Sequence, residues 1–341
     1  MEKFKVGIVG CGFISNYHIQ GLQSVEDVEV EAVCDFNIDV AKKQAERYRI
    51  SRYMSDTEEL FALKNIDAVL ILTPNFTHKD LAIAAVRNGK HVMVQKPFAP
   101  NLSDCQDMIR IAEEEGVQLV PSFMHRFFPE CRKAKEIIKE GLIGRLMTVR
   151  IRNGVQGATW AKWFFDPEKT GGGAVIDVGV HGIDLLRYLI GEILEVGAFT
   201  EIHERYRKMD DGTNVELKYE DSATVIYRFD NNVLGLHDIS WSQKAGAKRF
   251  ELEIYGDKGT ITIRKDEHLL KVASSEFDSV NNWVIPEIAS EPMGYKQHKD
   301  FVDGIKGISK PSLTARDGLA TIKVIKAIYK SAEENIFVSI E

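Results

Sequence analysis

The segment Phe4-Lys-Val-Gly-Ile-Val-Gly10-Cys-Gly12-Phe-Ile-Ser15 decides the fold of the first part of the chain. The mostly apolar run Phe4–Val9 predicts a buried strand, and the glycines after it predict a tight turn into a helix. Gly10 allows the turn, and Gly12 lets an anion approach the backbone N–H groups at the helix N-terminus. The third small position of this pattern is Ser15, where glycine or alanine is usual.

A second predicted strand, Val28–Cys34, ends at Asp35, roughly 20 residues beyond the glycines. Strand, glycine turn, helix, strand and acid in this order are typical of a dinucleotide-binding unit, although an ordinary βαβ turn would have the same local structure. The Asp35 carboxylate can accept hydrogen bonds from the adenosine ribose hydroxyls. Because it would repel a 2′-phosphate, it favours NAD over NADP.

The βα pattern continues, and polar residues repeatedly follow the ends of predicted strands. Thr73–Asn75 follows the apolar run Ala68–Leu72, Lys96 follows His91–Val94, and Ser122–Arg126 follows Val117–Val120. The carboxyl ends of parallel strands meet at one crevice, where ligands bind. Lys96 is therefore predicted to face the nicotinamide end of a dinucleotide, and the alternative is a surface lysine before a proline turn.

The second part of the chain has a different hydrophobic pattern, in which apolar and polar residues alternate from Leu146 onward. This alternation predicts an α+β domain with a large open, mainly antiparallel sheet that has one solvent-facing side. We therefore expect an α/β Rossmann domain over residues 1–122 and an open-sheet domain over 123–341, whose final helices can pack back on the first. The exposed sheet face predicts a homo-oligomer.

A glycine-led segment in the second part, Gly171–Leu186, carries Asp177, His181 and Asp184 among apolar neighbours. On a helix these spacings place the three polar groups on one face. Polar groups on a helix that is otherwise apolar usually line a cavity or a binding site, so we predict a catalytic cavity here. A buried structural histidine is the alternative for His181, and Asp184 is expected either to support Asp177 and His181 or to be structural.

Aromatic residues precede these glycines, among them Trp160 and Trp163. Their rings suit a ligand with apolar faces and hydroxyl edges, such as a sugar, but they equally suit a loop that is pinned by buried tryptophans. Arg126 and Tyr295 are further candidates for substrate binding.

Taken in order, the motifs resemble those of the glucose–fructose oxidoreductase, inositol dehydrogenase and rhizopine-catabolism (Gfo/Idh/MocA) family. They are Gly10-x-Gly12, Asp35, Thr73-Pro74-Asn75-x-x-His78, Gln95-Lys96-Pro97, Arg126-Phe-x-Pro129, Gly171-Gly-Gly-x-x-x-Asp177-x-Gly-x-His181 and Pro311-Ser-Leu-Thr-x-x-Asp317-Gly. The resemblance implies NAD(P)-dependent oxidation or reduction of a sugar, a cyclitol or their derivatives by dimers or tetramers. It also implies that Lys96, Asp177 and His181 are the catalytic residues.

One position departs from the pattern of that family, which usually has Glu-Lys-Pro where this chain has Gln95-Lys96-Pro97. Glutamine keeps the hydrogen-bonding shape of glutamate but removes a negative charge beside the lysine. The residues predicted to contact the cofactor are Gly10, Gly12, Phe13, Ile14, Asp35, Thr73, Pro74, Asn75, His78, Gln95 and Lys96.

The predicted reaction is hydride transfer between the nicotinamide and a secondary alcohol or ketone. His181 would take the hydroxyl proton, Lys96 would stabilise the developing alkoxide, and Asp177 would orient His181 or hold a neighbouring hydroxyl. Two alternatives stay open. One is a redox-neutral lyase or glycosidase acting through a transient keto sugar, and the other is a nucleotide-sensing regulatory protein on the same scaffold.

The composition excludes other functional classes. The net charge of −7 does not favour binding of a negatively charged nucleic acid. No apolar run approaches the roughly 18 residues of a membrane span. The cysteines Cys11, Cys34, Cys105 and Cys131 are scattered, so we expect neither disulfides nor a metal site. A cytoplasmic protein is the expectation.

Overall fold

The computed structural model describes residues 3–246, 248–277 and 283–340. It divides the chain into two units. The first unit comprises Met1–Phe127 with Ser290–Ala320, and the second comprises Phe128–Ala289 with Thr321–Glu341. The domain boundary predicted after residue 122 stays a prediction.

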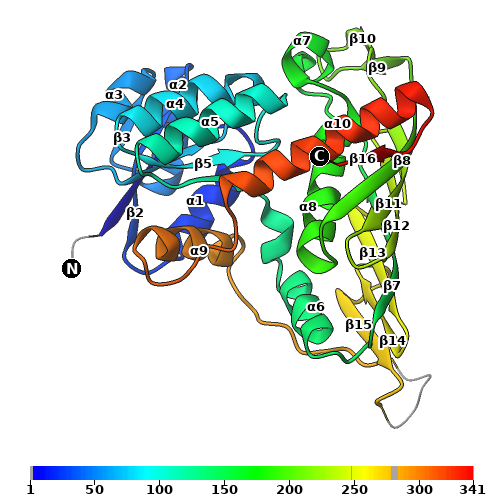
Figure 1. The fold of residues 1–341 in the computed structure, drawn as a ribbon. Helices are drawn as coiled ribbons and strands as arrows, with labels where there is room; N and C mark the ends of the chain where they lie inside the picture. The colour runs from blue at the N-terminus through cyan, green and yellow to red at the C-terminus, as the bar shows by residue number, and fades with distance from the viewer. Residues whose placement is uncertain (1–2, 247, 278–282, 341) are drawn as a thin grey trace. The chain divides into compact units, whose positions relative to one another are not determined.

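The first unit is built on a parallel sheet of six strands in the order β3-β2-β1-β4-β5-β6 (Figure 1). This is the strand order of a dinucleotide-binding Rossmann fold, with its switch point between β1 and β4. The predicted Rossmann domain is therefore confirmed. The strands are β1 (Phe4–Val9), β2 (Val28–Cys34), β3 (Arg52–Met54), β4 (Ala68–Ile71), β5 (His91–Gln95) and β6 (Leu119–Ser122).

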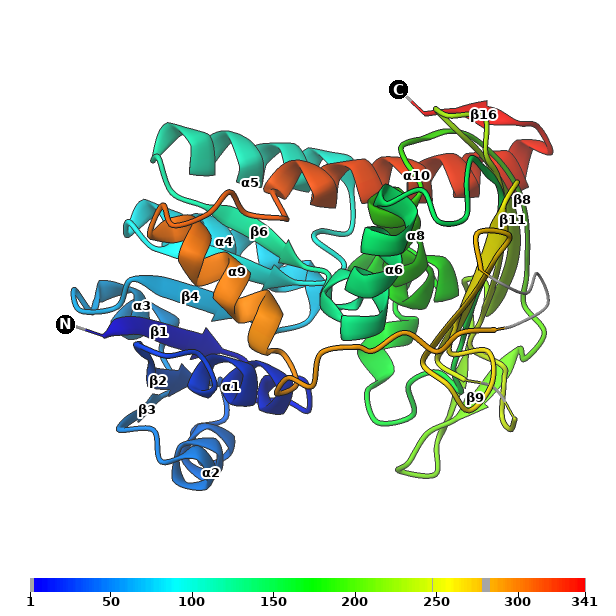
Figure 2. The same cartoon turned by 90° about the horizontal axis from the view of Figure 1, so that it is seen from below.

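Helices cover this sheet, with α4 packed beside α5 and α1 packed beside α9 (Figure 2). Local capping explains several of their starts. Asn101 caps α5, because its side chain accepts a hydrogen bond from the Asp104 N–H. The helices are α1 (Ser15–Gln23), α2 (Ile38–Tyr48), α3 (Thr57–Ala62), α4 (His78–Arg87), α5 (Leu102–Glu114) and α9 (Tyr295–Ile305), with short 3₁₀ turns at Asn75–Thr77 and Met124–Phe127.

The second unit is built on a sheet of eight strands in the order β15-β14-β13-β7-β12-β11-β8-β16. All neighbours pair antiparallel except β7 and β12, which are parallel. The predicted mainly antiparallel sheet is confirmed. Its strands are β7 (Leu146–Gly154), β8 (Ile193–Glu201), β11 (Ser222–Phe229), β12 (Leu234–Ser240), β13 (Phe250–Gly256), β14 (Gly259–Ile263), β15 (Leu270–Ser274) and β16 (Val338–Ser339), and β9 (Tyr206–Lys208) pairs with β10 (Asn214–Glu216).

Helices α6 (Pro129–Lys139) and α8 (Val180–Leu189) lie on the same side of this sheet (Figure 1). Along β11 buried and exposed residues alternate, so alternate side chains point into the core and away from it. The remaining helices are the short α7 (Pro167–Thr170) and the long α10 (Ala315–Glu334), which belongs to the first unit up to Ala320 and to the second from Thr321.

Among the helices of the described residues, none is both long enough and apolar enough to cross a membrane. The predicted cytoplasmic location stays a prediction.

Candidate functional site

The glycine turn after β1 is built as the sequence pattern requires. Gly10 has a φ of 94°, and a Cβ there would meet the Leu72 carbonyl oxygen at 2.9 Å, so only glycine fits without strain. A Cβ at Gly12 would meet nothing within 4 Å, which leaves open space over the turn. The Ser15 hydroxyl donates to the Gly12 carbonyl at 2.6 Å and accepts from the Gln44 amide at 2.8 Å, so serine stabilises the turn and links it to α2.

Asp35 lies at the end of β2 with its carboxylate held by backbone groups. One oxygen accepts from the Cys11 N–H at 2.9 Å and the other from the Asn37 N–H at 3.0 Å. The side chain stays half-exposed, so it retains lone pairs for a ligand hydroxyl. The next residue, Phe36, is 95% exposed. Sequence reasoning missed Phe36, although an aromatic residue directly after the strand-end acid was a signal for it.

The start of α1 fits the phosphates of a dinucleotide. The helix has no side-chain cap and no acidic residue in its first turn, so no group of its own competes for an anion. Phe13 and Ile14 lie directly before this helix, and Phe13 is 90% exposed.

His78 links the ends of β4 and β5. Its Nε2 lies 2.9 Å from the Thr73 carbonyl oxygen, and its Nδ1 lies 3.0 Å from the Pro97 carbonyl oxygen. Burial lowers the pKa of His78 to about 4, so the ring is neutral at neutral pH. The Thr73–Asn75 segment and the Gln95–Pro97 segment are thereby brought together, as the strand-end argument predicts.

The remaining predicted site residues of the first unit have different environments. The Lys96 side chain is half-buried, and its backbone N–H donates to the Gln95 side-chain oxygen at 2.8 Å. Arg126 is buried and donates to the Ser312 carbonyl at 2.9 Å, with Asp317 at 3.4 Å. Its guanidinium thus holds the segment before α10, and its substrate role stays a prediction. Tyr295 is the half-exposed first residue of α9.

In the second unit, the glycine-led segment does not form the continuous α-helix that the spacing suggested. Val175–Gly179 is a π-helical turn that contains Asp177, and α8 begins only at Val180. Such turns occur mostly inside helices and frequently at functional sites. Asp177 is half-buried, whereas His181 and Asp184 are buried.

Two side chains from distant strands and loops fix this segment, and sequence reasoning missed both. The Trp241 indole N–H donates to the Asp177 carboxylate at 2.9 Å. Glu220 accepts from the Val175 N–H and from the Tyr329 hydroxyl, each at 2.9 Å. Burial raises the pKa of Glu220 to about 7. No local pattern signals either contact, since both partners lie far from the segment along the chain.

The aromatic segment before the glycines is only partly anchored by tryptophan. Trp160 is 69% exposed, and the half-buried Trp163 stacks on Phe164 with ring centroids 3.9 Å apart. The buried anchor is instead Phe165, which packs edge-on against Trp241. The alternative of a loop pinned by buried Trp160 and Trp163 is therefore wrong, and sugar binding at this segment stays a prediction.

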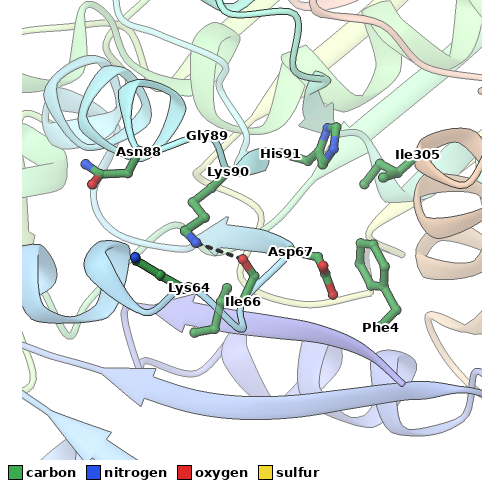
Figure 3. A pocket seen from close by; sticks show the side chains of 9 residues that line it. All are labelled: Phe4, Lys64, Ile66, Asp67, Asn88, Gly89, Lys90, His91 and Ile305. Carbon is green, nitrogen blue, oxygen red and sulfur yellow. Dashed lines mark hydrogen bonds between the residues drawn. The ribbon is translucent and has the colours of Figure 1, made fainter. Parts of the chain in front are cut away.

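A separate cavity of about 400 Å³ lies in the first unit, away from the candidate cofactor residues (Figure 3). Phe4 and His91, which begin β1 and β5, line it, so it lies at the amino end of the sheet. The ammonium group of Lys90 is engaged there, donating to the carbonyls of Leu63 and Ile66 at 2.7 and 2.8 Å. This cavity lacks the strand-end residues and is not the predicted site.

Two family models match the chain. Residues 4–123 match the model described as oxidoreductase family, NAD-binding Rossmann fold, and residues 131–262 match the GFO/IDH/MocA C-terminal domain. Together these two ranges cover most of the chain, and each lies where the resemblance of the motifs placed the corresponding part.

The similar proteins include dehydrogenases of cyclitols and sugars. Myo-inositol 2-dehydrogenase of Thermotoga maritima is 28% identical over 342 residues, which cover 99% of this chain and 98% of that protein. Levoglucosan dehydrogenase of Pseudarthrobacter phenanthrenivorans is 26% identical over 391 residues, which cover 100% of this chain and 99% of that protein. A solved structure of levoglucosan dehydrogenase with NADH and levoglucosan superposes with a TM-score of 0.90 at 24% identity, covering 100% of both chains, which shows a shared fold.

Proposed function

The chain belongs to the GFO/IDH/MocA oxidoreductase family, and on this premise we propose that it transfers hydride between NAD and a secondary alcohol or ketone of a sugar, a cyclitol or a derivative. The observation that carries the proposal is the glycine turn with Asp35 at the end of β2, in a sheet of the order 3-2-1-4-5-6. The relatives that act on myo-inositol and levoglucosan support the substrate class.

Among the described residues of the first unit, there are suitable groups for each part of a dinucleotide: the pyrophosphate, the ribose, the adenine and the nicotinamide. The uncapped start of α1 with the open space over Gly12 suits the pyrophosphate. The oriented Asp35 carboxylate suits the ribose hydroxyls of NAD, and the exposed Phe36 ring suits the adenine face. The ends of β4 and β5, with Lys96, are assigned to the nicotinamide end.

We assign the chemistry to Lys96, Asp177 and His181. NAD, when bound, supplies the hydride acceptor or donor. For oxidation of an alcohol, His181 takes the hydroxyl proton, and the Lys96 side chain hydrogen-bonds the reacting oxygen as alkoxide character develops. Asp177, whose carboxylate is oriented by Trp241, holds a neighbouring substrate hydroxyl or His181.

Substitution of the assigned residues tests this function. We expect Lys96→Ala and His181→Ala each to lower turnover at least about a hundredfold, whereas NADH still raises the melting temperature of both variants. Lys139→Ala and His268→Ala, which change a lysine at the exposed end of α6 and a histidine in the β14–β15 loop, are matched controls. Wild-type turnover in both site variants with the true substrate would overturn the assignment.

The substrate and the overall reaction are found by one screen with inositols, aldoses, anhydro sugars, glycosides and sugar phosphates. Net accumulation of NADH supports a dehydrogenase. Product formation without net NADH supports the redox-neutral route instead, and tight NADH binding without any turnover supports a nucleotide sensor.

The open face of the eight-stranded sheet is the surface that we assign to a homodimer or homotetramer. An apolar patch lies on the outward side of the neighbouring strands β12, β11 and β8, and it includes Phe199 on β8, Ile226 on β11 and Leu236 on β12, which are 75%, 45% and 36% exposed in the single chain. Such an exposed apolar patch is typical of an interface.

A further inference from the structure

A buried polar cluster lies in the first unit, where α1 packs beside α9 next to the ends of β5 and β6. All its side chains are buried, and hydrogen bonds connect them to one another. They are Tyr17 and His18 on α1, Gln95 and Ser122 at the two strand ends, and Gln297 and His298 on α9.

The direction of the hydrogen bonds is fixed at one end by the backbone of Lys96. This N–H can only donate, and it donates to the Gln95 side-chain oxygen at 2.8 Å, so the amide nitrogen of Gln95 faces the other way. That nitrogen lies 3.0 Å from Nε2 of His18, which must therefore accept. In a neutral ring the proton is then on Nδ1, which lies 2.9 Å from Nε2 of His298.

The direction is fixed independently at the other end by the carbonyl of Gly294. This oxygen can only accept, and Nδ1 of His298 lies 2.6 Å from it, so His298 carries its proton on Nδ1. In a neutral ring Nε2 of His298 then accepts, and the donor facing it must be Nδ1 of His18. Both ends of the chain of bonds therefore require the same tautomer of each ring.

A branch of the cluster agrees with this direction. The Tyr17 hydroxyl donates to the Gln297 oxygen at 3.0 Å, and the Gln297 amide donates to the Ser122 hydroxyl at 3.0 Å. The Ser122 proton is then free to point at Nε2 of His18, 3.5 Å away, which again acts as an acceptor. Burial lowers the pKa of His18 well below its usual value and that of His298 to about 4, and it raises the pKa of Tyr17, so these groups are neutral at neutral pH.

We propose that Gln95 is a positioning residue that holds His18 and His298 as neutral Nδ1–H tautomers, in one directed chain of hydrogen bonds from the backbone of Lys96 to the first turn of α9. This series of hydrogen bonds attaches the nucleotide-binding helix α1 and the backbone at Lys96 to the same buried groups. Only the catalytic importance of Lys96 rests on the proposed function, because the tautomers are a property of the protein without substrate.

The amide at position 95 is essential to this arrangement, because it both accepts and donates. A glutamate has the same shape and can accept from the Lys96 N–H, but its ionised form cannot donate to Nε2 of His18. In a Gln95→Glu variant, all of these hydrogen bonds can form only when the cluster binds one additional proton, either on the new carboxyl group or on a histidine ring. The variant with a protonated carboxyl group is a close mimic of the natural protein.

Nuclear magnetic resonance of protein labelled with ¹⁵N-histidine tests the tautomers directly at neutral pH. Among the nine histidines, we expect the rings of His18 and His298 each to carry a single proton, on Nδ1, with signals identified by their loss in His18→Asn and His298→Asn. An Nε2–H tautomer or a doubly protonated ring at either position would overturn the proposal.

A second measurement does not depend on the folding of the histidine variants. The additional proton of Gln95→Glu is bound in the folded state and is released from the unfolded chain at lower pH. The melting temperature of this variant, relative to the natural protein, therefore falls as the pH rises from about 5 to about 8. Gln23→Glu makes the same change at an exposed position of α1 and serves as the control.

The outcomes separate this proposal from the proposed function. A difference in melting temperature that stays constant with pH for Gln95→Glu, as we expect for Gln23→Glu, would refute the directed chain. A full loss of turnover in Lys96→Ala would leave this result unchanged, and so would a failure to find any turnover.

Discussion

Asp35 is the residue on which the choice between NAD and NADP depends, because its oriented carboxylate would face either the ribose hydroxyls or a 2′-phosphate. We expect the natural protein to bind NADH more tightly than NADPH. In Asp35→Ser a charged hydrogen bond to the ribose is lost and the repulsion of the phosphate is removed, so the ratio of the two dissociation constants shifts toward NADPH by about tenfold or more.

Titration of protein fluorescence or of bound NADH fluorescence measures both constants. Asp39→Ser, at an exposed position of α2, removes a nearby negative charge without touching the end of β2 and should leave the ratio within about twofold. An unchanged ratio in Asp35→Ser would show that this carboxylate does not face the ribose.

Glu220 is a buried carboxyl group whose ionisation works against folding. Its pKa is raised to about 7 by burial, from 4.5 in the unfolded chain. Stability from the protonated form is therefore fully present below about pH 4.5 and is lost as the pH rises through about 7. At about 1.4 kcal/mol for each pKa unit, the loss is on the order of 3 kcal/mol.

Replacement of Glu220 by glutamine should remove this dependence, because the amide oxygen can still accept from the Val175 N–H and the Tyr329 hydroxyl. We expect the urea midpoint of Glu220→Gln to match that of the natural protein near pH 5 and to exceed it near pH 8. Tryptophan fluorescence reports this unit, since all four tryptophans lie within residues 160–283. Equal pH dependence of the two proteins would contradict the argument.

At the level of elements, the start of the π-helical turn depends on the absence of a side chain at Gly173. A Cβ there would meet the Glu220 carbonyl oxygen at 2.1 Å, a backbone atom that cannot move cheaply. We expect Gly173→Ala to displace the turn that carries Asp177, to cost about 1–3 kcal/mol of stability and to lower turnover by about a hundredfold.

NADH binding separates this local effect from general unfolding, because the residues assigned to the cofactor belong to the other unit. The dissociation constant for NADH should therefore stay unchanged in Gly173→Ala. Gly212→Ala is a suitable comparison, since its Cβ would meet nothing within 4 Å and only the backbone is strained. Turnover at the natural rate in Gly173→Ala would show that the position of this turn does not matter for the reaction.

Elements with a strong local signal could be predicted from the sequence, and those that depend on distant partners could not. The strands Phe4–Val9 and Val28–Cys34 have the predicted bounds, since apolar periodicity and turn-forming residues act within a few positions. The short edge strand Arg52–Met54 was missed, because three residues show no period. The π-helical turn was missed because its spacing also suits an α-helix.

The same distinction holds for the candidate site. Gly10, Asp35 and Lys96 could be predicted because each follows directly after a strand, and strand ends meet at one edge of a parallel sheet. Trp241 and Glu220 could not, because they reach Asp177 and Val175 only through the pairing of strands and loops that are far apart in the chain. Gln95 is likewise notable in the sequence as a departure from the usual glutamate, but its hydrogen bond to His18 could not be predicted, because His18 lies far from it along the chain.

At the level of the whole molecule, the outward face of the eight-stranded sheet carries an apolar patch on the neighbouring strands β12, β11 and β8. Ile226 on β11 lies in register between Gly197 on β8 and Leu236 on β12, and a Cβ at Gly197 would meet the exposed Phe337 ring at 2.6 Å. The ion pair between Arg228 and Glu195 lies on the same strands. A charge at position 226 would be desolvated in any interface through this face.

We therefore expect Ile226→Arg to dissociate the oligomer, because an unpaired buried charge near the centre of an interface costs at least about 2 kcal/mol, or roughly 30-fold in the dissociation constant. Light scattering coupled to size-exclusion chromatography at micromolar concentration gives the mass of each species. Ile308→Arg introduces the same charge at an exposed isoleucine of the first unit, and its mass should equal that of the natural protein. A natural protein that is already monomeric, or an Ile226→Arg variant of unchanged mass, would show that this face is not the interface.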